Sequence, residues 1–244
     1  MQILTDGLVL REQTVGESDR LITVLTRSDG IIRAFARGAR NLRNKSASAT
    51  QMLSYSDFAV FRGRESDVID SADVRKVFFG LRNDLERLTL AQYFCELCNV
   101  FKPYENESEE FLRLILNSLH FLTEKTHNPE LIKAITELRV ASIAGYAPNL
   151  IACDGCAKFE DPVMYFKIDD GTLYCENCHK ENCISITLTV LKAMRHIVYS
   201  KFEHLYSFTI PEHAAKELST LTEKFVTYQT EHKFTTLDFL RGII

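Results

Sequence analysis

Two short cysteine motifs constrain the fold of this chain more than any other feature of its sequence. Each motif has a cysteine at both ends of a four-residue stretch, and eighteen residues separate the two motifs. A gap of two residues lets one tight turn direct both sulfurs toward the same metal ion, and two such turns supply four thiolate ligands. The spacing therefore predicts a zinc ribbon whose ligands are Cys153, Cys156, Cys175 and Cys178.

The expected cofactor is one structural Zn²⁺ ion, because four sulfurs complete a tetrahedron and leave no position open for water or substrate. Its binding energy, on the order of 10 kcal/mol, would serve as folding energy for a short segment rich in loops. Gly155 and Gly171 are expected to supply the permissive backbone of the turns. The apolar run at 164–166 and the turn at 169–171 predict a small hairpin between the motifs.

Other interpretations of the cysteines fit less well. Four reduced thiols would have to reach paired ribbon spacing by accident. Disulfides are disfavoured because the chain has seven cysteines, an odd number, and because no signal peptide or long apolar segment indicates export. A catalytic zinc of the deaminase type requires His-x-Glu and Pro-Cys-x-x-Cys, whereas Ala152 precedes the first motif and Tyr174 the second.

Length and charge limit what the remaining residues can form. At 244 residues the chain can hold one large domain, or two smaller domains and the ribbon. No apolar stretch approaches the length of a membrane span, so a cytoplasmic protein is expected. The net charge of −4 argues against a uniformly basic nucleic-acid binder. Residues 27–45, however, carry six Lys and Arg against one Asp, a basic stripe that suits phosphate.

The first 75 residues predict a small closed sheet, for which an OB-type barrel is the simplest candidate. Five short strands are expected at 3–11, 20–26, 31–37, 55–62 and 67–74. In the third strand alternate side chains share a face. Those expected to point inward are Ile32, Ala34 and Ala36, and those expected to point outward are Arg33, Phe35 and Arg37.

An exposed row of cation, aromatic ring and cation suits single-stranded nucleic acid, because guanidinium groups meet phosphates and the ring offers a stacking surface. A solvated strand, with Phe35 covering a neighbouring element, is the equal alternative. The loop at 38–46 has few apolar residues and little reason to pack against a core, so we expect a mobile phosphate-binding arm or a flexible charged loop. The candidate nucleic-acid-binding residues are Arg33, Phe35, Arg37, Arg40, Arg43, Lys45, Arg62 and Arg64.

From residue 81 the apolar period becomes that of helices. Asn83 and Glu86 predict a capping box that opens the first helix. One face of this helix is expected to hold Leu85, Leu88, Gln92, Cys95 and Asn99. The apolar sector is expected to be widened by Tyr93, Phe94, Leu97 and Phe101. Cys95 and Cys98 are expected to be core or boundary residues, because no partner pair accompanies them. Further helices are expected at 108–122, 129–142, 189–201, 211–228 and 236–241.

The predicted fold class is α+β, with an N-terminal five-stranded OB-fold barrel followed by an α-helical domain that carries an inserted four-cysteine zinc ribbon. The expected domains are 1–80 for the nucleic-acid-binding barrel, 81–150 for the first helical part, 151–183 for the ribbon and 184–244 for the C-terminal helical part. The histidines are scattered, and no nucleophile elbow, Walker loop or Gly-x-Gly-x-x-Gly occurs. The sequence favours a binding protein over an enzyme.

A transcription- or translation-associated factor that contacts nucleic acid or a protein subunit through the zinc ribbon itself is the alternative function. Binding phosphate in this way would require basic residues in the ribbon, but residues 153–178 hold two lysines against six Asp and Glu. His179 directly follows the second motif. Because the four cysteines already complete the ligand set, His179 is expected beside the ligands or at the surface.

Six short motifs and the paired cysteines follow one another through nearly the whole chain. The motifs are GLVLR at 7–11, GESDRL at 16–21, ARGAR at 36–40, NDL at 83–85, ELR at 137–139 and GYAPNL at 145–150. In this order they resemble the bacterial RecO family, the recombination mediators of DNA repair. The resemblance implies an N-terminal OB fold, a helical domain and a zinc-binding module, in agreement with the patterns above.

The resemblance also implies a function. Proteins of this family bind single- and double-stranded DNA, anneal complementary strands and, with RecR, help load RecA onto DNA coated by single-strand-binding protein. In some members the helical domain receives the acidic, apolar C-terminal tail of single-strand-binding protein. Carried over to this chain, Arg139 is the candidate contact for that tail, and an ion pair at the surface or within the helical bundle is the alternative, with at least equal weight. The expected location is the cytoplasm, in association with the nucleoid.

Overall fold

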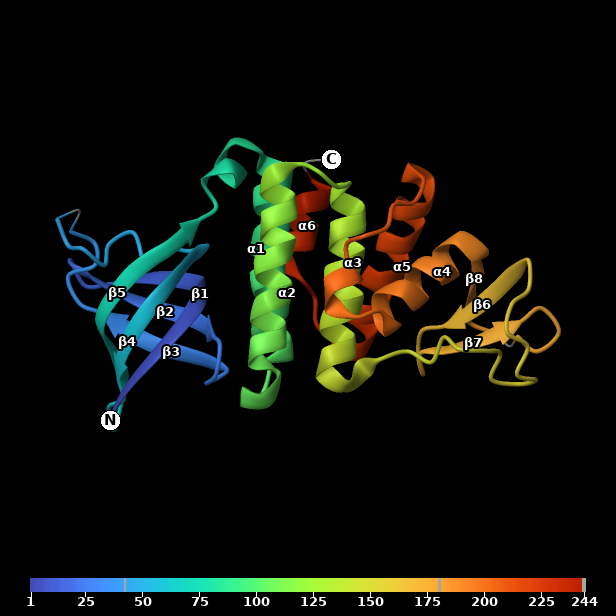
Figure 1. Cartoon of the computed structure of the whole chain (residues 1–244), viewed down its shortest axis with the longest axis horizontal. Coiled ribbons are helices and arrows are strands. Elements are labelled where there is room, and N and C mark those ends of the chain that lie inside the picture. The colour runs from blue at the N-terminus through green and yellow to red at the C-terminus, as the bar shows by residue number, and fades with distance from the viewer. Residues whose placement is uncertain (42, 180, 243–244) are drawn as a thin grey trace. The chain divides into compact units, whose positions relative to one another are not determined.

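The computed structural model describes residues 1–41, 43–179 and 181–242. The chain divides into two compact units, one formed by Met1–Glu124 with Thr235–Ile244 and the other by Lys125–Phe234. Figure 1 shows the elements of each unit along the chain. These units are defined by packing, and the four domain ranges expected from the sequence stay a prediction.

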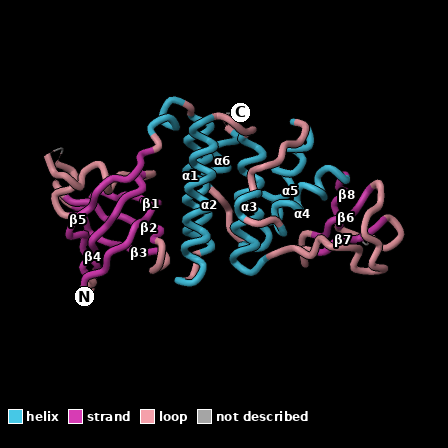
Figure 2. The backbone as a smooth tube through the Cα atoms, viewed as in Figure 1, coloured by secondary structure: helices cyan, strands magenta, loops and turns pink. Residues whose placement is uncertain are grey.

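The first unit begins with a closed five-stranded barrel, whose strands are magenta in Figure 2. The strands are β1 (Gln2–Val15), β2 (Asp19–Thr26), β3 (Ile31–Ala36), β4 (Ser54–Phe61) and β5 (Asp67–Val77). They pair in the order β1-β2-β3-β5-β4, and all neighbours are antiparallel except β3 and β5. The predicted five-stranded barrel is therefore confirmed, with the mixed pairing of an OB fold.

The predicted phase of β3 is also confirmed, because Ile32, Ala34 and Ala36 all belong to the buried core of the barrel. The prediction for the β3–β4 connection is wrong where it denied packing against the core. Ala39 and Ala49 from this connection are completely buried in the same core. Small side chains can enter a barrel from a polar loop without disturbing its close packing, and a count of apolar residues does not detect them.

The helical part of the first unit holds a 3₁₀ turn (Phe79–Asn83), α1 (Leu85–Phe101), α2 (Glu105–Glu124) and α6 (Thr235–Arg241). The N-cap of α1 is Asp84, which accepts a hydrogen bond from the Arg87 amide, so the predicted Asn83 capping box is wrong. The predicted apolar sector is confirmed at Tyr93, Phe94 and Cys95, which are buried, but it is wrong at Leu85, which is 54% exposed. Helix α1 packs against α2, α6 and β1, which spreads burial beyond a single stripe.

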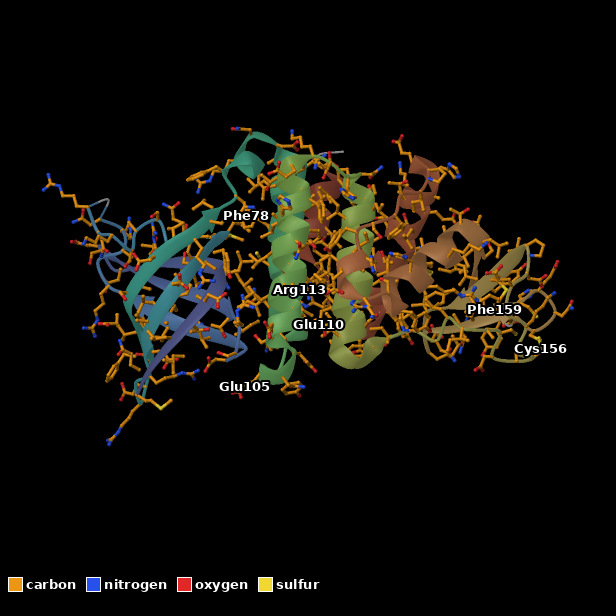
Figure 3. All side chains as sticks on the ribbon, viewed as in Figure 1. Phe78, Glu105, Glu110, Arg113, Cys156 and Phe159 are labelled. Carbon is orange, nitrogen blue, oxygen red and sulfur yellow. The ribbon has the colours of Figure 1, made fainter. Side chains whose placement is uncertain are left out.

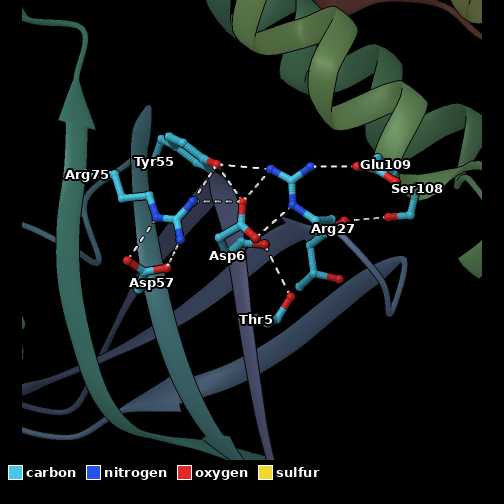
Figure 4. Close-up of polar contacts among 9 residues, drawn as sticks. Thr5, Asp6, Arg27, Tyr55, Asp57, Arg75, Ser108 and Glu109 are labelled. Atoms are coloured by element: carbon cyan, nitrogen blue, oxygen red, sulfur yellow. Dashed lines mark hydrogen bonds and ion pairs between the residues drawn. The ribbon is translucent and has the colours of Figure 1, made fainter.

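A polar cluster joins the barrel to α2 (Figure 4). The Arg27 guanidinium donates to both carboxylate oxygens of Asp6 at 2.8 and 2.9 Å and to Glu109 of α2 at 2.8 Å. The Ser108 hydroxyl of α2 donates to the Thr26 carbonyl. These bonds fix the start of α2 against β1 and the end of β2.

Asp6 lies at the centre of this cluster, where Tyr55 donates to it and Arg75 lies 3.5 Å away. Burial alone would raise the pKa of Asp6. Hydrogen bonds from Arg27 and Tyr55, together with the charges of Arg27 and Arg75, outweigh burial and hold this pKa below its usual value. The Asp6 carboxylate therefore stabilises the folded barrel in its charged form.

The second unit contains helices α3 (Pro129–Ala141), α4 (Leu188–Tyr199) and α5 (Glu212–Thr230), which confirm three predicted helices. A π turn (Ser142–Tyr146) follows α3, and a 3₁₀ turn (Phe202–His204) follows α4. Between α3 and α4 lie β6 (Val163–Lys167), β7 (Thr172–Cys175) and β8 (Cys183–Thr187), which form an antiparallel sheet in the order β7-β6-β8. Strands β6 and β7 are the predicted hairpin.

Candidate functional site

The four predicted cysteine ligands lie together at one end of the β6–β7 hairpin. The Sγ atoms of Cys153, Cys156, Cys175 and Cys178 all lie within 4.8 Å of one another, and the Cys156 and Cys175 sulfurs are 3.6 Å apart. A tetrahedral ion with Zn–S bonds of about 2.3 Å requires sulfurs about 3.8 Å apart. The cluster therefore fits a four-thiolate metal site. Figure 3 labels one of its members, Cys156.

Backbone hydrogen bonds build the first cysteine motif as a tight loop. The Ala157 amide donates to the Cys153 carbonyl at 2.8 Å, and the Cys153 amide donates to the Lys158 carbonyl at 2.8 Å. The Asp154 amide donates to the Leu173 carbonyl of β7, also at 2.8 Å. The last bond places the first motif directly beside the strand that leads into the second.

The two glycines of the ribbon act in different ways. Gly171 has a φ of 65° in the hairpin turn, which confirms its predicted conformational role. Gly155 does not have a positive φ, so its expected role is wrong. A Cβ added to Gly155 would lie 3.0 Å from Cys178 Cβ and 3.2 Å from Cys178 Sγ. Gly155 is needed because the second motif packs against it.

The crowding of four sulfurs separates the pKa values of their thiols. Burial raises the pKa of Cys153, but hydrogen bonds from the amides of Cys175, Cys156 and Gly155 outweigh it and lower that pKa to about 6. Hydrogen bonds with the sulfurs of Cys156 and Cys175 raise the pKa of Cys178 to about 12. A bound cation would replace the shared protons and favour four thiolates.

The other residues considered as metal ligands are His179, Cys95 and Cys98, and each of them packs elsewhere. His179 is exposed, and its ring stacks on Tyr165 with centroids 3.9 Å apart. Its Nδ1 lies 2.6 Å from the Glu176 carbonyl oxygen. Cys95 and Cys98 are buried within α1, where burial raises the pKa of Cys95 to about 12, so their prediction as core residues is confirmed.

The outer face of β1, β2 and β3 carries the candidate nucleic-acid surface. In β3, Arg33 is exposed and Phe35 is half-buried, both on the side away from the barrel core. The strand register places Arg11, Thr23 and Arg33 opposite one another in one row across the three strands. The next row holds Gln13, Leu21 and Phe35. Two guanidinium groups thus flank a polar residue beside an aromatic ring.

Arg11 is the residue that sequence reasoning missed. It is exposed, and it shares a face with Arg33 because both pair with Thr23. A register shift between Val9 and Arg11 changes the phase of β1, so simple alternation does not assign Arg11 to this face. The sequence feature that could have indicated Arg11 was a long first strand that ends in polar residues.

The connection after β3 contributes further exposed cations. Arg37, Arg40, Arg43 and Lys45 are all exposed. Arg40 also has a packing role, because its Nη1 donates to the carbonyls of Gly16 at 3.2 Å and Glu17 at 2.8 Å. It thereby ties this connection to the β1–β2 turn. The predicted basic loop is thus held in place on the barrel over its described residues, and Leu42 lies outside them.

The remaining candidate arginines differ in how many polar contacts they form within the protein. Arg64 is exposed, whereas Arg62 forms ion pairs with Asp29 at 3.0 Å and Asp67 at 3.6 Å. Arg139 donates from Nη1 to the carbonyls of Ile197, Val198 and Ser200 at the end of α4. Its guanidinium is therefore part of the packing of the second unit.

The ribbon surface is acidic. Lys158 pairs with Asp161 at 2.8 Å, and Lys167 pairs with Asp170 at 2.8 Å, so each lysine is matched by an acid of the ribbon itself. The remaining acids of residues 153–178 leave the segment with a negative charge. An acidic surface repels phosphate, which disfavours the alternative of a ribbon that binds nucleic acid directly.

Together these features define a class of protein that joins an OB-type barrel to a helical region with an inserted four-cysteine ribbon. The family model described as Recombination protein O N terminal matches residues 1–78, and the model described as Recombination protein O C terminal matches residues 82–238. The chain therefore belongs to the RecO family of DNA repair proteins.

Relatives in this family are similar over nearly their full length. The chain is 34% identical over 241 residues to the DNA repair protein RecO of Acetivibrio thermocellus, covering 98% of this chain and 96% of that protein. It is 30% identical to the DNA repair protein RecO of Caldicellulosiruptor bescii, covering 99% and 98%. Within the described residues, no helix combines the length and apolar character needed to cross a membrane.

Proposed function

We propose that this chain binds single- and double-stranded DNA, anneals complementary strands and, with RecR, helps load RecA onto DNA coated by single-strand-binding protein. The observation that carries the proposal is the row of exposed Arg11, half-buried Thr23 and exposed Arg33 beside Phe35. The acts proposed are binding and exchange of partners in the cytoplasm, at the nucleoid, and no catalytic step is assigned to the chain. Membership of a DNA repair family supports this proposal.

The proposed annealing mechanism is electrostatic. Guanidinium groups on the β1–β3 face neutralise phosphates and release their counterions, which lowers the repulsion between two strands held near the same surface. Phe35 offers one stacking surface, so most bases stay free to pair. Contacts of this kind position the backbone without reading sequence, as annealing of arbitrary strands requires.

The test is the salt dependence of DNA binding after replacing Arg11 and Arg33 together by Ala. Loss of two phosphate contacts should reduce the slope of log K against log salt for single strands by about 1.4, since each contact contributes about 0.7. Annealing should slow in parallel. The matched control removes two exposed lysines of α5, Lys216 and Lys224, and should leave the slope unchanged. An unchanged slope in the arginine variant would move the DNA site elsewhere.

A groove between β8 and α5 supports a proposed site for the tail of single-strand-binding protein. The groove has a volume of about 340 Å³, an apolar floor of Ile184, Ile186 and Leu221, and a rim that includes two lysines and one acid, Lys216, Lys224 and Glu217. Among the described strands β8 pairs only with β6, so its other edge can bond an added extended peptide. An acidic and apolar chain end matches both the floor and the rim.

This groove replaces Arg139 as our candidate tail site, because Nη1 of Arg139 is engaged with carbonyls of α4. Replacing Lys216 and Lys224 by Ala should weaken binding of a fluorescent tail peptide by about 3- to 10-fold, since rim charges contribute up to about 1 kcal/mol each. The Arg11 and Arg33 double variant should bind the peptide normally. Equal loss in both variants would argue against two separate surfaces.

We also propose that the cysteine cluster holds one Zn²⁺ ion with a structural role. Four thiolates satisfy the coordination of the ion and leave no open position, so it would supply folding energy to the ribbon. Elemental analysis of the purified chain should find about one zinc per molecule. Another metal, or none, would contradict the assignment.

A further inference from the structure

One arginine of α4 holds both ends of the segment that carries the first cysteine motif. Arg195 Nε donates to the Leu150 carbonyl at 2.7 Å, and Nη2 donates to the carbonyls of Ile151 at 2.8 Å and Phe159 at 2.7 Å. Its Nη1 donates to the Glu160 carboxylate at 2.9 Å. These partners come from before and after Cys153 and Cys156 in the chain.

The position of Arg195 makes these bonds strong. Its side chain is 13% exposed, and its guanidinium lies over the Phe159 ring at 4.1 Å from the centroid. A planar guanidinium with several donors in fixed directions can bind several acceptors at once, which a lysine ammonium on a flexible stem does not reproduce. Figure 3 labels Phe159 and Cys156 in this segment. The segment is thereby closed into a loop on the surface of α4.

We propose that Arg195 is a positioning residue for the metal site. It holds the first cysteine motif at the distance from the second motif that one ion requires. Cys156 is exposed, so burial in a core does not fix its position. With Arg195 in place, the two sulfurs of this motif need little reordering when the ion binds. By linkage, metal binding in turn stabilises the contacts of residues 150–160 with α4.

The inference rests on the proposed metal site and is tested on the full chain loaded with Zn²⁺. Transfer of zinc to a chromogenic chelator should be about tenfold faster in Arg195→Lys and Arg195→Gln than in the wild type, the size of effect seen for groups that orient metal ligands. With Co²⁺, the thiolate charge-transfer band should weaken or shift in the same variants. Amide exchange at Cys153 and Asp154 should accelerate.

The matched control is Lys192→Gln. Lys192 lies on the same helix and pairs with the same Glu160 at 3.9 Å, but it is largely exposed. It should release zinc at the wild-type rate. Release at the wild-type rate by both Arg195 variants would overturn the proposal.

A second variant keeps the test decisive if the Arg195 variants do not fold. Glu160→Gln removes the charge of the carboxylate that Arg195 binds, and it should speed zinc release about two- to threefold. Wild-type release and unchanged amide exchange in Glu160→Gln would then overturn the proposal. Failure of the wild type itself to bind Zn²⁺ or Co²⁺ would instead reject the metal site, a distinct result.

Discussion

The barrel and the cysteine ribbon reach a defined structure by different means. The barrel closes its sheet around a core of aliphatic side chains and Phe58. The ribbon has three short strands, and its two cysteine motifs meet through their sulfurs and through the close approach of Cys178 to Gly155. Packing of the core allows many different residues on the surface of the barrel, whereas metal coordination requires particular residues at fixed positions in the sequence. A binding surface is therefore harder to predict on the barrel than on the ribbon.

The largest effect that would test this contrast is expected from Cys153→Ala. Loss of one thiolate should abolish stable metal binding and remove a contribution on the order of 10 kcal/mol from the ribbon. Metal content should fall to near zero, and the β6–β8 amides should lose protection from exchange. The amides of the barrel strands should keep theirs. Loss of protection in both regions would show that the barrel depends on the ion.

The converse change is Phe58→Ala in the barrel core. Phe58 is 2% exposed, and truncating a buried phenylalanine costs about 3–5 kcal/mol. Denaturant unfolding followed at the barrel should show this loss of stability. Zinc release from the ribbon should keep its wild-type rate, and a faster release would mean that the two regions are coupled.

A smaller effect is expected from Asp6→Asn, which tests how far the barrel also relies on charge. The lowered pKa of Asp6 means that its carboxylate stabilises the fold above the unfolded pKa of about 3.9, and that this contribution is lost as pH falls through the folded pKa. The variant should be about 1–2 kcal/mol less stable at pH 7. The difference should shrink below about pH 4. A constant difference down to pH 2 would contradict this role.

The smallest effect is expected from His179→Ala. The ring is exposed and stacks on Tyr165, so its removal should change the free energy of unfolding by less than about 0.5 kcal/mol. Zinc content should stay at the wild-type value, because His179 lies outside the four-sulfur set. A lower zinc content would identify the histidine as a ligand after all.

The same contrast explains what could be predicted from the sequence. The spacing of Cys153, Cys156, Cys175 and Cys178 was enough to predict the cluster, since each gap is a local property of the chain. The need for glycine at 155 was not predicted for the right reason. It depends on the approach of Cys178, which lies more than twenty residues away and becomes a neighbour only after folding.

On the barrel, strand number and the phase of β3 followed from alternation, but the neighbours of β3 did not. Arg11 joins Arg33 through pairing with Thr23, and that register depends on a bulge in β1. The burial of Ala39 was missed for a similar reason, because it depends on the space that the barrel strands leave. The α1 N-cap at Asp84 is a local feature, and the prediction placed it one residue too early, at Asn83.

The seam that closes the barrel lies at the proposed stacking residue. Strands β3 and β5 join through only two residue pairs, Ala34 with Asp67 and Phe35 with Val68. Every other strand pair of the barrel is longer. A DNA strand bound on Phe35 would therefore contact the shortest strand pairing of the barrel. DNA binding should then make the whole barrel more rigid.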